Sequence, residues 1–355
     1  MFPKLLSSLI KTLFYFLIFN KKRRDIYFCR LSGIINSMFG KKSWYRPAID
    51  WFFNFKNINI YMPYKNKIIV TGGTGFVGTN LIKFFLRKTK YKIISIDNYS
   101  SGKISNHIKS TRIKYIKGNT LNISKLIKRP NEIKTVFHFG EFARIYQSFL
   151  QMSECLESNS IGSNAVFNFC LKNKIKLIYS ATSASLGNKG NDKNLSPYAF
   201  SKSKNLELLE NLKKWFNFKY EVIYFYNVYG PYQISKGEMS TVIGIFEENY
   251  KKRKPLPIVK PGTQTRRFTH IDDTVNICYL AWKKNLCRHY SIANKKSYSI
   301  LEVAKMFKSK IKFLPKRPGE RYTSALIKKN LSNKMHKHFG KINLKNYIKN
   351  FIENN

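Results

Sequence analysis

Residues 71–78 read Thr-Gly-Gly-Thr-Gly-Phe-Val-Gly and directly follow the apolar run Lys-Ile-Ile-Val at 67–70. A short β-branched run predicts a buried strand. The glycines allow a tight turn, close approach of phosphate to the backbone, and close packing of helix on strand. We expect a helix from about Phe76, with its first amides facing the pyrophosphate of a dinucleotide. The spacing is G-x-x-G-x-x-G rather than G-x-G-x-x-G, so a plain glycine turn remains the alternative.

A carboxylate follows this loop at a suitable distance. Residues 92–96 read Lys-Ile-Ile-Ser-Ile, which predicts a second strand, and Asp97 comes directly after it. A carboxylate about twenty residues past the loop accepts hydrogen bonds from both ribose hydroxyls of an adenosine and repels a 2′-phosphate. The sequence therefore favours NAD over NADP. Taken alone, Asp97 also suits a helix cap or a turn.

The composition limits the class of protein. A chain of 355 residues that is 43% hydrophobic suits a doubly wound nucleotide-binding domain, a smaller part and an extension. The net charge of +46 fits attraction to nucleic acid or to an anionic membrane, or else compositional drift. The lysines are spread along the whole chain, which favours drift and disfavours nucleic acid as a partner.

The cysteines and histidines indicate neither a disulfide framework nor a metal site. The chain has 5 cysteines without a C-x-x-C pair, and its 6 histidines show no ligand spacing. We therefore expect no metal and a reducing, cytoplasmic location.

Residues 1–61 form a basic and apolar extension. The apolar run 5–19 is interrupted by Lys11 and followed by the basic cluster 21–24. A membrane span needs roughly twenty residues, and a secretory signal carries its charge before the apolar run. A helix within residues 1–30 at the inner membrane surface and an untuned extension both stay open. We expect a chain that starts at Met62 to be a complete enzyme.

From residue 67 onward, strand-like runs alternate with helical stretches. This alternation predicts an α/β fold, a doubly wound parallel sheet of Rossmann type, with a smaller C-terminal substrate-binding domain. We expect the NAD-binding domain at 62–230, with 268–292 returning to it. The substrate-binding domain would then comprise 231–267 and 293–355. Expected strands are 67–71, 92–96, 113–116, 135–139, 175–179, 220–225 and 289–292, and expected helices are 76–88, 153–172, 198–215 and 272–284.

Residues 198–202 read Tyr-Ala-Phe-Ser-Lys. Residues four apart share a helix face, so the Tyr198 phenol and the Lys202 ammonium should point the same way. A nearby ammonium lowers the pKa of a phenol and makes it a usable base near neutral pH. The hydroxyl-rich run 177–183 ends an earlier strand, and Thr182 is its best-placed hydroxyl. Such a Tyr–Lys pair is common by chance in a lysine-rich chain, so its weight comes from its order after the glycine loop and Asp97.

With these motifs, the chain resembles the extended short-chain dehydrogenase/reductase family, in its NAD-dependent sugar-nucleotide epimerase/dehydratase branch. The resemblance covers roughly residues 65–350 and is greatest to the UDP-glucose 4-epimerase group. Further stretches that carry it are 97–102 DNYSSG, 136–139 VFHF, 197–202 PYAFSK, 227–231 NVYGP, 264–273 QTRRFTHIDD and 317–320 RPGE.

This resemblance implies roles for the matched residues. Thr182, Tyr198 and Lys202 match the catalytic triad. The matched cofactor positions are Gly72, Gly75, Phe76, Val77, Gly78, Asp97, Asn98, Asn119, Asn159, Tyr198 and Lys202. The matched substrate positions are Asn227, Arg266 and Arg317 at the nucleotide diphosphate and Glu320 at the nucleotide ribose. A guanidinium suits phosphate oxygens, although a solvated surface arginine is the alternative in so basic a chain.

Three departures from the family pattern leave the sugar open. Asn119 replaces the usual Asp near the adenine amine, and its amide oxygen still accepts a hydrogen bond. Gly140-Glu141 replaces the usual small pair after the fourth strand, which puts a carboxylate in the wall of the site close to Arg144. Arg267 replaces a common Asp.

The residues after Thr182 help to choose the reaction. Related 4,6-dehydratases resemble one another in having Asp-Glu directly after the triad threonine, and related decarboxylases carry a Glu two residues after it. Here Ser183 and Ala184 occupy these positions, and neither can transfer the proton. The resemblance therefore implies epimerisation of a nucleotide-diphosphate sugar at C4, with a UDP-sugar favoured. Tyr198 would act as base, the intermediate would be a 4-keto sugar, and the enzyme would be a homodimer.

Two other functions stay open. A reductase, dehydrogenase or dehydratase of the same family would use the same fold. The charge instead suits an RNA-binding protein on this fold, but such a protein has no need of the triad, Asn227, Arg266 and Arg317.

Overall fold

The computed structural model describes residues 10–11, 65–184, 193–284, 289–319 and 335–355. The chain divides into two compact units, Met1–Met62 and Pro63–Asn355. Almost all of the first unit, including the predicted extension, lies outside the described residues.

The central element of the second unit is a sheet of eight described strands, which pair in parallel throughout. The spatial order is β14-β11-β6-β5-β4-β1-β2-β3. Its core order 3-2-1-4-5-6 is that of the Rossmann fold, so the predicted fold class is confirmed. The strands are β1 Lys67–Thr71, β2 Lys92–Asp97, β3 Ile113–Lys117, β4 Ile133–His138, β5 Lys176–Thr182, β6 Tyr220–Phe225, β11 His289–Ala293 and β14 Met335–Phe339.

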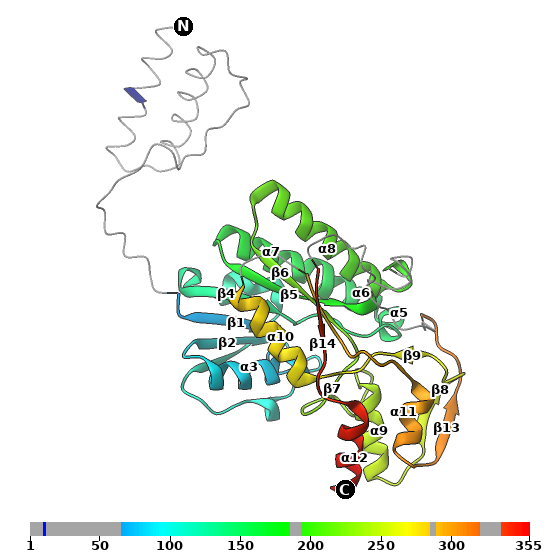
Figure 1. Ribbon diagram of the computed structural model, residues 1–355. Helices are drawn as coiled ribbons and strands as arrows, with labels where there is room; N and C mark the ends of the chain where they lie inside the picture. Colours follow the sequence, from blue (N-terminus) through cyan, green and yellow to red (C-terminus); the bar gives the residue numbers. More distant parts are fainter. Residues whose placement is uncertain (1–9, 12–64, 185–192, 285–288, 320–334) are drawn as a thin grey trace. The chain divides into compact units, whose positions relative to one another are not determined.

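Helices cover both faces of this sheet (Figure 1). Successive side chains of a strand point to opposite faces. Ile69 of β1 accordingly joins the cluster with helices α7 and α8, whereas Ile68 and Val70 join the cluster with α3 and α10. This double burial explains the continuous apolar runs in the sequence. The covering helices are α3 Phe76–Lys88, α7 Ser163–Lys172, α8 Pro197–Phe216 and α10 Ile271–Lys283.

The predicted helix 153–172 is interrupted by a wider turn. Helix α6, Met152–Leu156, continues into a π-helical stretch, Glu157–Gly162, before α7 begins. Gly162 lies against Thr120, because a Cβ added there would come within 2.6 Å of its Oγ1. The π-helical stretch places Asn159 inside the protein. The short helices between β2 and α6 are η2 Ile104–Asn106, η3 Thr120–Asn122, α4 Ile123–Leu126, η4 Pro130–Glu132 and α5 Gln147–Leu150.

A third apolar cluster builds a smaller C-terminal part. It includes Phe246, Val303 and Ile348 from three different helices. Helix α11 begins with a capping box between Ser299 and Glu302, which satisfies two free amides at once. The elements are β7 Val228–Tyr229, α9 Val242–Lys251, β8 Leu256–Val259, β9 Thr265–Arg266, β10 Thr269–His270, β12 Tyr298–Ser299, α11 Ile300–Met306, β13 Ile311–Leu314 and α12 Leu344–Glu353.

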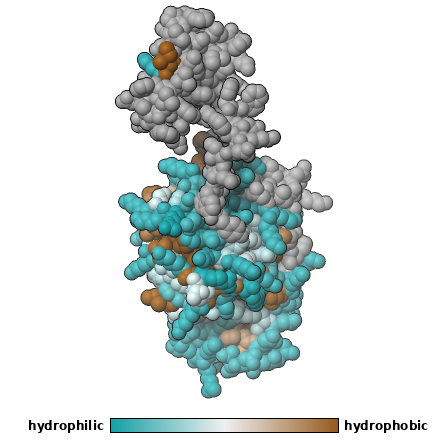
Figure 2. All heavy atoms as spheres, turned by 90° about the vertical axis from the view of Figure 1, so that its left-hand side faces the viewer, coloured by the Kyte–Doolittle hydropathy of each residue, from teal (hydrophilic) through white to brown (hydrophobic). Residues whose placement is uncertain are grey.

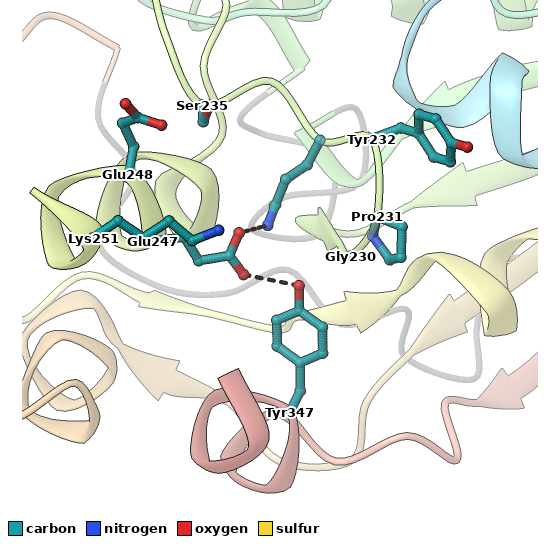
Figure 3. Close-up of a pocket in the computed structure, with 9 residues that line it drawn as sticks. Gly230, Pro231, Tyr232, Ser235, Glu247, Glu248, Lys251 and Tyr347 are labelled. Atoms are coloured by element: carbon teal, nitrogen blue, oxygen red, sulfur yellow. Dashed lines mark hydrogen bonds between the residues drawn. The ribbon is translucent and has the colours of Figure 1, made fainter. Parts of the chain in front are cut away.

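A shallow pocket beside the Gly230–Pro231 turn shows how α12 is fastened to α9 (Figure 3). Glu247 of α9 accepts hydrogen bonds from Gln233 Nε2 and Tyr347 Oη, both at 2.8 Å. Burial raises the pKa of Glu247, which these two bonds oppose. The contacts are those of a structural clamp between two helices.

Strand β14 differs from the domain prediction. Residues 293–355 were expected in the substrate-binding domain, yet the backbone of 335–339 pairs in parallel with β11 of the main sheet. The segment reads Met-His-Lys-His-Phe and lacks the apolar run typical of a buried strand. The segment is a strand because its backbone pairs with the open edge of β11, whose amides and carbonyls need hydrogen-bond partners.

The surface reflects the excess of lysine. Figure 2 shows one face on which hydrophilic side chains predominate and apolar ones form small groups. No helix among the described residues combines the length and the apolar character needed to cross a membrane.

Candidate active site

The turn from β1 into α3 forms a cradle of backbone amides. Gly72 has φ +68°, a conformation that glycine adopts readily. A Cβ added to Gly78 would lie 2.1 Å from the Gly72 carbonyl oxygen, so only glycine allows this contact between helix and turn. No side chain caps α3 at Gly75, which leaves the first amides of the helix, at Phe76 and Val77, available to an anion.

Asp97 lies beside this turn at the end of β2 and is buried. Its Oδ2 accepts a hydrogen bond from the Thr74 amide at 2.9 Å, and its Oδ1 accepts one from the Tyr99 amide at 2.8 Å. Each oxygen keeps a free lone pair. The buried Thr74 hydroxyl has no hydrogen-bond partner within the described part of the chain. The free amides, this unpaired hydroxyl and the fixed carboxylate fit the phosphates and the ribose of a dinucleotide.

The three asparagines predicted at the cofactor make structural contacts in this structure. Asn98 is exposed and accepts a hydrogen bond from the Ser100 amide at 3.1 Å. Asn119 caps η3 through the Leu121 amide at 3.0 Å. Asn159 is fully buried, accepts from the Phe142 amide at 2.7 Å and donates to the Phe142 carbonyl at 3.0 Å. Their contacts to a cofactor stay predictions.

The structure brings Thr182, Tyr198 and Lys202 together. Thr182 ends β5, while Tyr198 and Lys202 lie four residues apart near the start of α8. Burial raises the pKa of Tyr198 to about 12, although the hydrogen bond with Thr182 and the charge of Arg144 act to lower it. Helix α8 starts where it does because Ser196 caps it, accepting from the Ala199 amide at 3.1 Å.

Lys202 is almost fully buried, with its side chain 4% exposed. Its ammonium donates to the Ser180 carbonyl at 2.6 Å and lies 4.7 Å from the centre of the Tyr179 ring. It also forms an ion pair with Glu141, the carboxylate that departs from the family pattern. Burial lowers the pKa of Lys202, and the charge of Glu141 opposes that shift.

The predicted substrate residues come from three separate segments. Asn227 is exposed after β6 and donates to the Arg267 carbonyl at 3.2 Å. Arg266 lies on β9, and its Nη1 donates to the Thr265 carbonyl at 2.9 Å. Arg317 is exposed, with its guanidinium 5.0 Å from the centre of the Tyr146 ring. Glu320 lies outside the described residues.

The third departure from the family pattern has a structural explanation. The Arg267 guanidinium donates to the carbonyls of Asn294, at 2.8 Å, and of Lys295. It therefore ties the end of β9 to the loop after β11. These contacts explain an arginine in place of the usual Asp without a different substrate.

The structure also reveals four buried polar residues around Glu141 that the sequence analysis missed. The sequence gives only a weak signal for these residues, because a polar residue inside an apolar strand or helix does not show which residue it contacts. They are His138, Ser163, Tyr179 and Asn205. Within the described ranges, no group of three or more His, Cys, Asp and Glu side chains could hold a metal ion.

The chain is similar to known proteins. A family model described as "NAD dependent epimerase/dehydratase family" matches residues 68–293. The chain is 29% identical to ADP-L-glycero-D-manno-heptose-6-epimerase of Brachyspira hyodysenteriae, over 68% of this chain and 80% of that protein. It is 26% identical to a putative UDP-glucose 4-epimerase of Methanocaldococcus jannaschii, over 69% of this chain and 83% of that protein.

A solved structure is similar as well. UDP-glucuronic acid 4-epimerase from Bacillus cereus, in complex with UDP-glucuronic acid and NAD, superposes with a TM-score of 0.70 at 25% identity, covering 81% of this chain and 99% of that one. The family match spans more than half of this chain. The amide cradle after β1 and the buried Asp97 carboxylate fit a dinucleotide. The chain therefore belongs to the NAD-dependent epimerase/dehydratase family of sugar-nucleotide enzymes, with NAD as its cofactor.

Proposed function

We propose that the protein epimerises a nucleotide-diphosphate sugar at C4, with a UDP-sugar as the favoured substrate. The observation that carries the proposal is the Thr182–Tyr198–Lys202 group, together with Ser183 and Ala184, which come directly after Thr182 in the sequence. The group suits removal and return of a hydroxyl proton, and the two residues that follow provide no acid for loss of water or of carbon dioxide.

In this mechanism, Tyr198 as phenolate accepts the proton of the sugar 4-hydroxyl. The hydroxyl of Thr182 donates its one proton in a hydrogen bond to the reacting oxygen. NAD, bound at the turn after β1 and at Asp97, supplies the chemistry of taking up a hydride from C4 and returning it. Tyr198 gives the proton back once the 4-keto sugar has turned over in the site and presents its other face.

Arg266, Arg317 and Asn227 would hold the nucleotide diphosphate during that rotation. Two guanidinium groups offer several donors to phosphate oxygens, so the diphosphate stays fixed while the sugar turns. The structural relative from Bacillus cereus is named a 4-epimerase of a UDP-sugar. Its name supports both the position on the sugar and the nucleotide.

A dehydratase is the second candidate, because the chain is also 27% identical to dTDP-D-glucose 4,6-dehydratase of Dictyostelium discoideum. The chain spans 61% of the length of that relative. Ser183 and Ala184 weigh against it for the reason given above.

We also propose a homodimer. An apolar hollow is lined by Phe149 and Met152 before α7 and by Leu195 and Phe200 at the start of α8. Each of these four side chains is at least 40% exposed. A second copy of the chain would bury this face. A single sedimenting species of monomer mass at micromolar concentration would contradict the dimer.

Incubation with UDP-, dTDP-, ADP- and GDP-sugars, followed by product analysis by NMR, tests the reaction. The expected product is the C4 epimer of a UDP-sugar, with Tyr198→Phe as the inactive control. A 4-keto-6-deoxy product would show a dehydratase, and inversion at another carbon would contradict C4.

A further inference from the structure

Glu141 is a buried carboxylate with an unusually complete set of donors. Its side chain is only 2% exposed, and it lies in the loop after β4. Lys202 forms an ion pair with it. The neutral donors to Glu141 are Ser163 Oγ at 2.8 Å and Tyr179 Oη at 3.0 Å. Ser180 Oγ and Asn205 Nδ2 lie farther from it, at 3.4 Å and 3.5 Å, and both have nearer acceptors. A carboxylate loses hydration on burial, and these partners replace it.

The network continues from Glu141 to the dinucleotide turn. His138 Nε2 lies 2.9 Å from Ser163 Oγ, and His138 Nδ1 lies 2.8 Å from Thr71 Oγ1. Thr71 Oγ1 also accepts a hydrogen bond from the Gly140 amide at 3.0 Å. A neutral imidazole protonated on Nε2 satisfies every group in this chain. Burial lowers the pKa of His138 to about 4, which keeps the ring neutral.

The ammonium of Lys202 has three N–H donors. One serves Glu141 and another serves the Ser180 carbonyl, so one remains. A lysine buried without a counter-charge tends to lose its proton, and the neutral amine keeps only two N–H groups. The charged ammonium keeps a third N–H, which a hydroxyl of bound NAD would accept.

We infer that Glu141 is a positioning residue for Lys202: it holds the buried ammonium in its charged form at the end of β5 and leaves one N–H for the cofactor. The inference rests on the proposed function only for the part that Lys202 plays in turnover. A small residue at position 141, the family's usual choice, would leave the lysine without this anchor.

Other charged or titratable groups also face the pair. They are His138 on β4, Cys155 on α6, Tyr179 on β5 and Tyr198 on α8. None of these groups is a carboxylate, so among the described residues that face Lys202 the negative charge comes from Glu141. Removal of Glu141 therefore removes the counter-charge of the ammonium.

Thermal unfolding of the full chain between about pH 4 and pH 10 tests the pair without any sugar turnover. In Glu141→Gln the buried ammonium lacks its counter-charge, so its pKa falls below that of the unfolded chain and stability rises with pH. The loss of Tm against the unmutated protein should be on the order of 5 °C or more near pH 6 and should shrink toward pH 10.

Lys202→Met should show the opposite trend. The carboxylate is then buried without its cation, its pKa rises above the unfolded value, and stability is lost as pH rises through that raised pKa. The double variant Glu141→Gln, Lys202→Met should unfold at a higher temperature than either single variant near pH 7. Glu154→Gln removes the same charge from an exposed site on α6 and should change Tm little at any pH.

Affinity for NAD is the second readout. Glu141→Gln should weaken NAD binding roughly tenfold, the loss of one charge-assisted hydrogen bond, while Glu141→Asp should retain most of it. The inference would be overturned if the losses of Tm in Glu141→Gln and Lys202→Met had the same dependence on pH. It would also be overturned if the double variant unfolded no higher than the more stable single variant near pH 7. If Glu141→Gln does not fold, the double variant still tests the inference. An ion pair between Glu141 and Lys202 requires that the double variant regain the folding that the single variant has lost. Failure of the sugar assay alone would affect only the proposed reaction.

Discussion

Tyr198 illustrates at the scale of single residues how burial and chemistry compete. Tyr198 is buried at the start of α8, which disfavours the phenolate, and the hydrogen bond with Thr182 offsets part of that effect. A base is useful only when it is ionised. Bound NAD adds positive charge nearby, which favours the phenolate.

Tyr198→Phe keeps the ring and removes the hydroxyl that we propose as the base. We expect the turnover of sugar nucleotide to fall roughly 10²–10⁴-fold, with Tm and NAD affinity close to those of the unmutated protein. Turnover at the original rate would remove Tyr198 from the mechanism.

We expect Asp97 to set the preference for NAD over NADP. Its carboxylate is held by two amides and should repel the 2′-phosphate of NADP. NAD should therefore bind much more tightly than NADP, and Asp97→Ala should narrow the gap. Fluorescence titration of both cofactors measures it, and equal affinities in the unmutated protein would contradict the assignment.

Arg266 and Arg317 should act on the substrate alone. Loss of one charge-assisted contact costs about 1.5–3 kcal/mol, so Arg266→Ala or Arg317→Ala should weaken UDP-sugar binding at least tenfold and leave NAD binding unchanged. Lys316→Ala, an exposed neighbour of Arg317, is the control. Calorimetry that finds unchanged affinity in both arginine variants would exclude the two residues from the site.

At the scale of elements, the contact between α3 and the β1 turn decides whether a dinucleotide can approach the backbone. Helix α3 packs on the sheet through Leu81, Ile82 and Phe85, and Gly78 allows the close contact at its start.

Gly78→Ala should disturb this contact, since its Cβ would meet the Gly72 carbonyl oxygen at 2.1 Å. We expect a loss of stability of about 1–3 kcal/mol and weakened NAD binding. Gly237→Asn is the matched control, because nothing lies within 4 Å of a Cβ there and Asn tolerates its positive φ. A Gly78→Ala protein with unchanged Tm and NAD affinity would show that the helix shifts freely.

At the scale of the whole molecule, residues 63–355 form a compact unit with the complete described sheet. We expect a chain that starts at Met62 to fold, to bind NAD like the full chain and to be equally active. The residues removed would affect only attachment to anionic membranes, where each basic residue near the surface contributes about 1 kcal/mol. Vesicle sedimentation compares the two proteins, and an insoluble or inactive shorter chain would show that residues 1–61 belong to the enzyme.

The sequence by itself determined the features that depend on neighbours in the chain. The glycine turn needs residues 70–78, and the Tyr–Lys spacing needs one helix. The alternating apolar runs then identify a parallel sheet that helices cover on both faces. These local rules were enough for the Rossmann fold and for the positions of Asp97, Thr182 and Tyr198.

Only the tertiary structure decided which distant residues meet. Glu141 and Lys202 lie 61 positions apart, and their pairing depends on how α8 packs beside the end of β4. The edge strand β14 likewise depends on backbone groups offered by β11. Neither contact leaves a periodic pattern in the chain, because the free energy of each comes from burial and hydrogen bonds that exist only once the sheet and its helices have assembled.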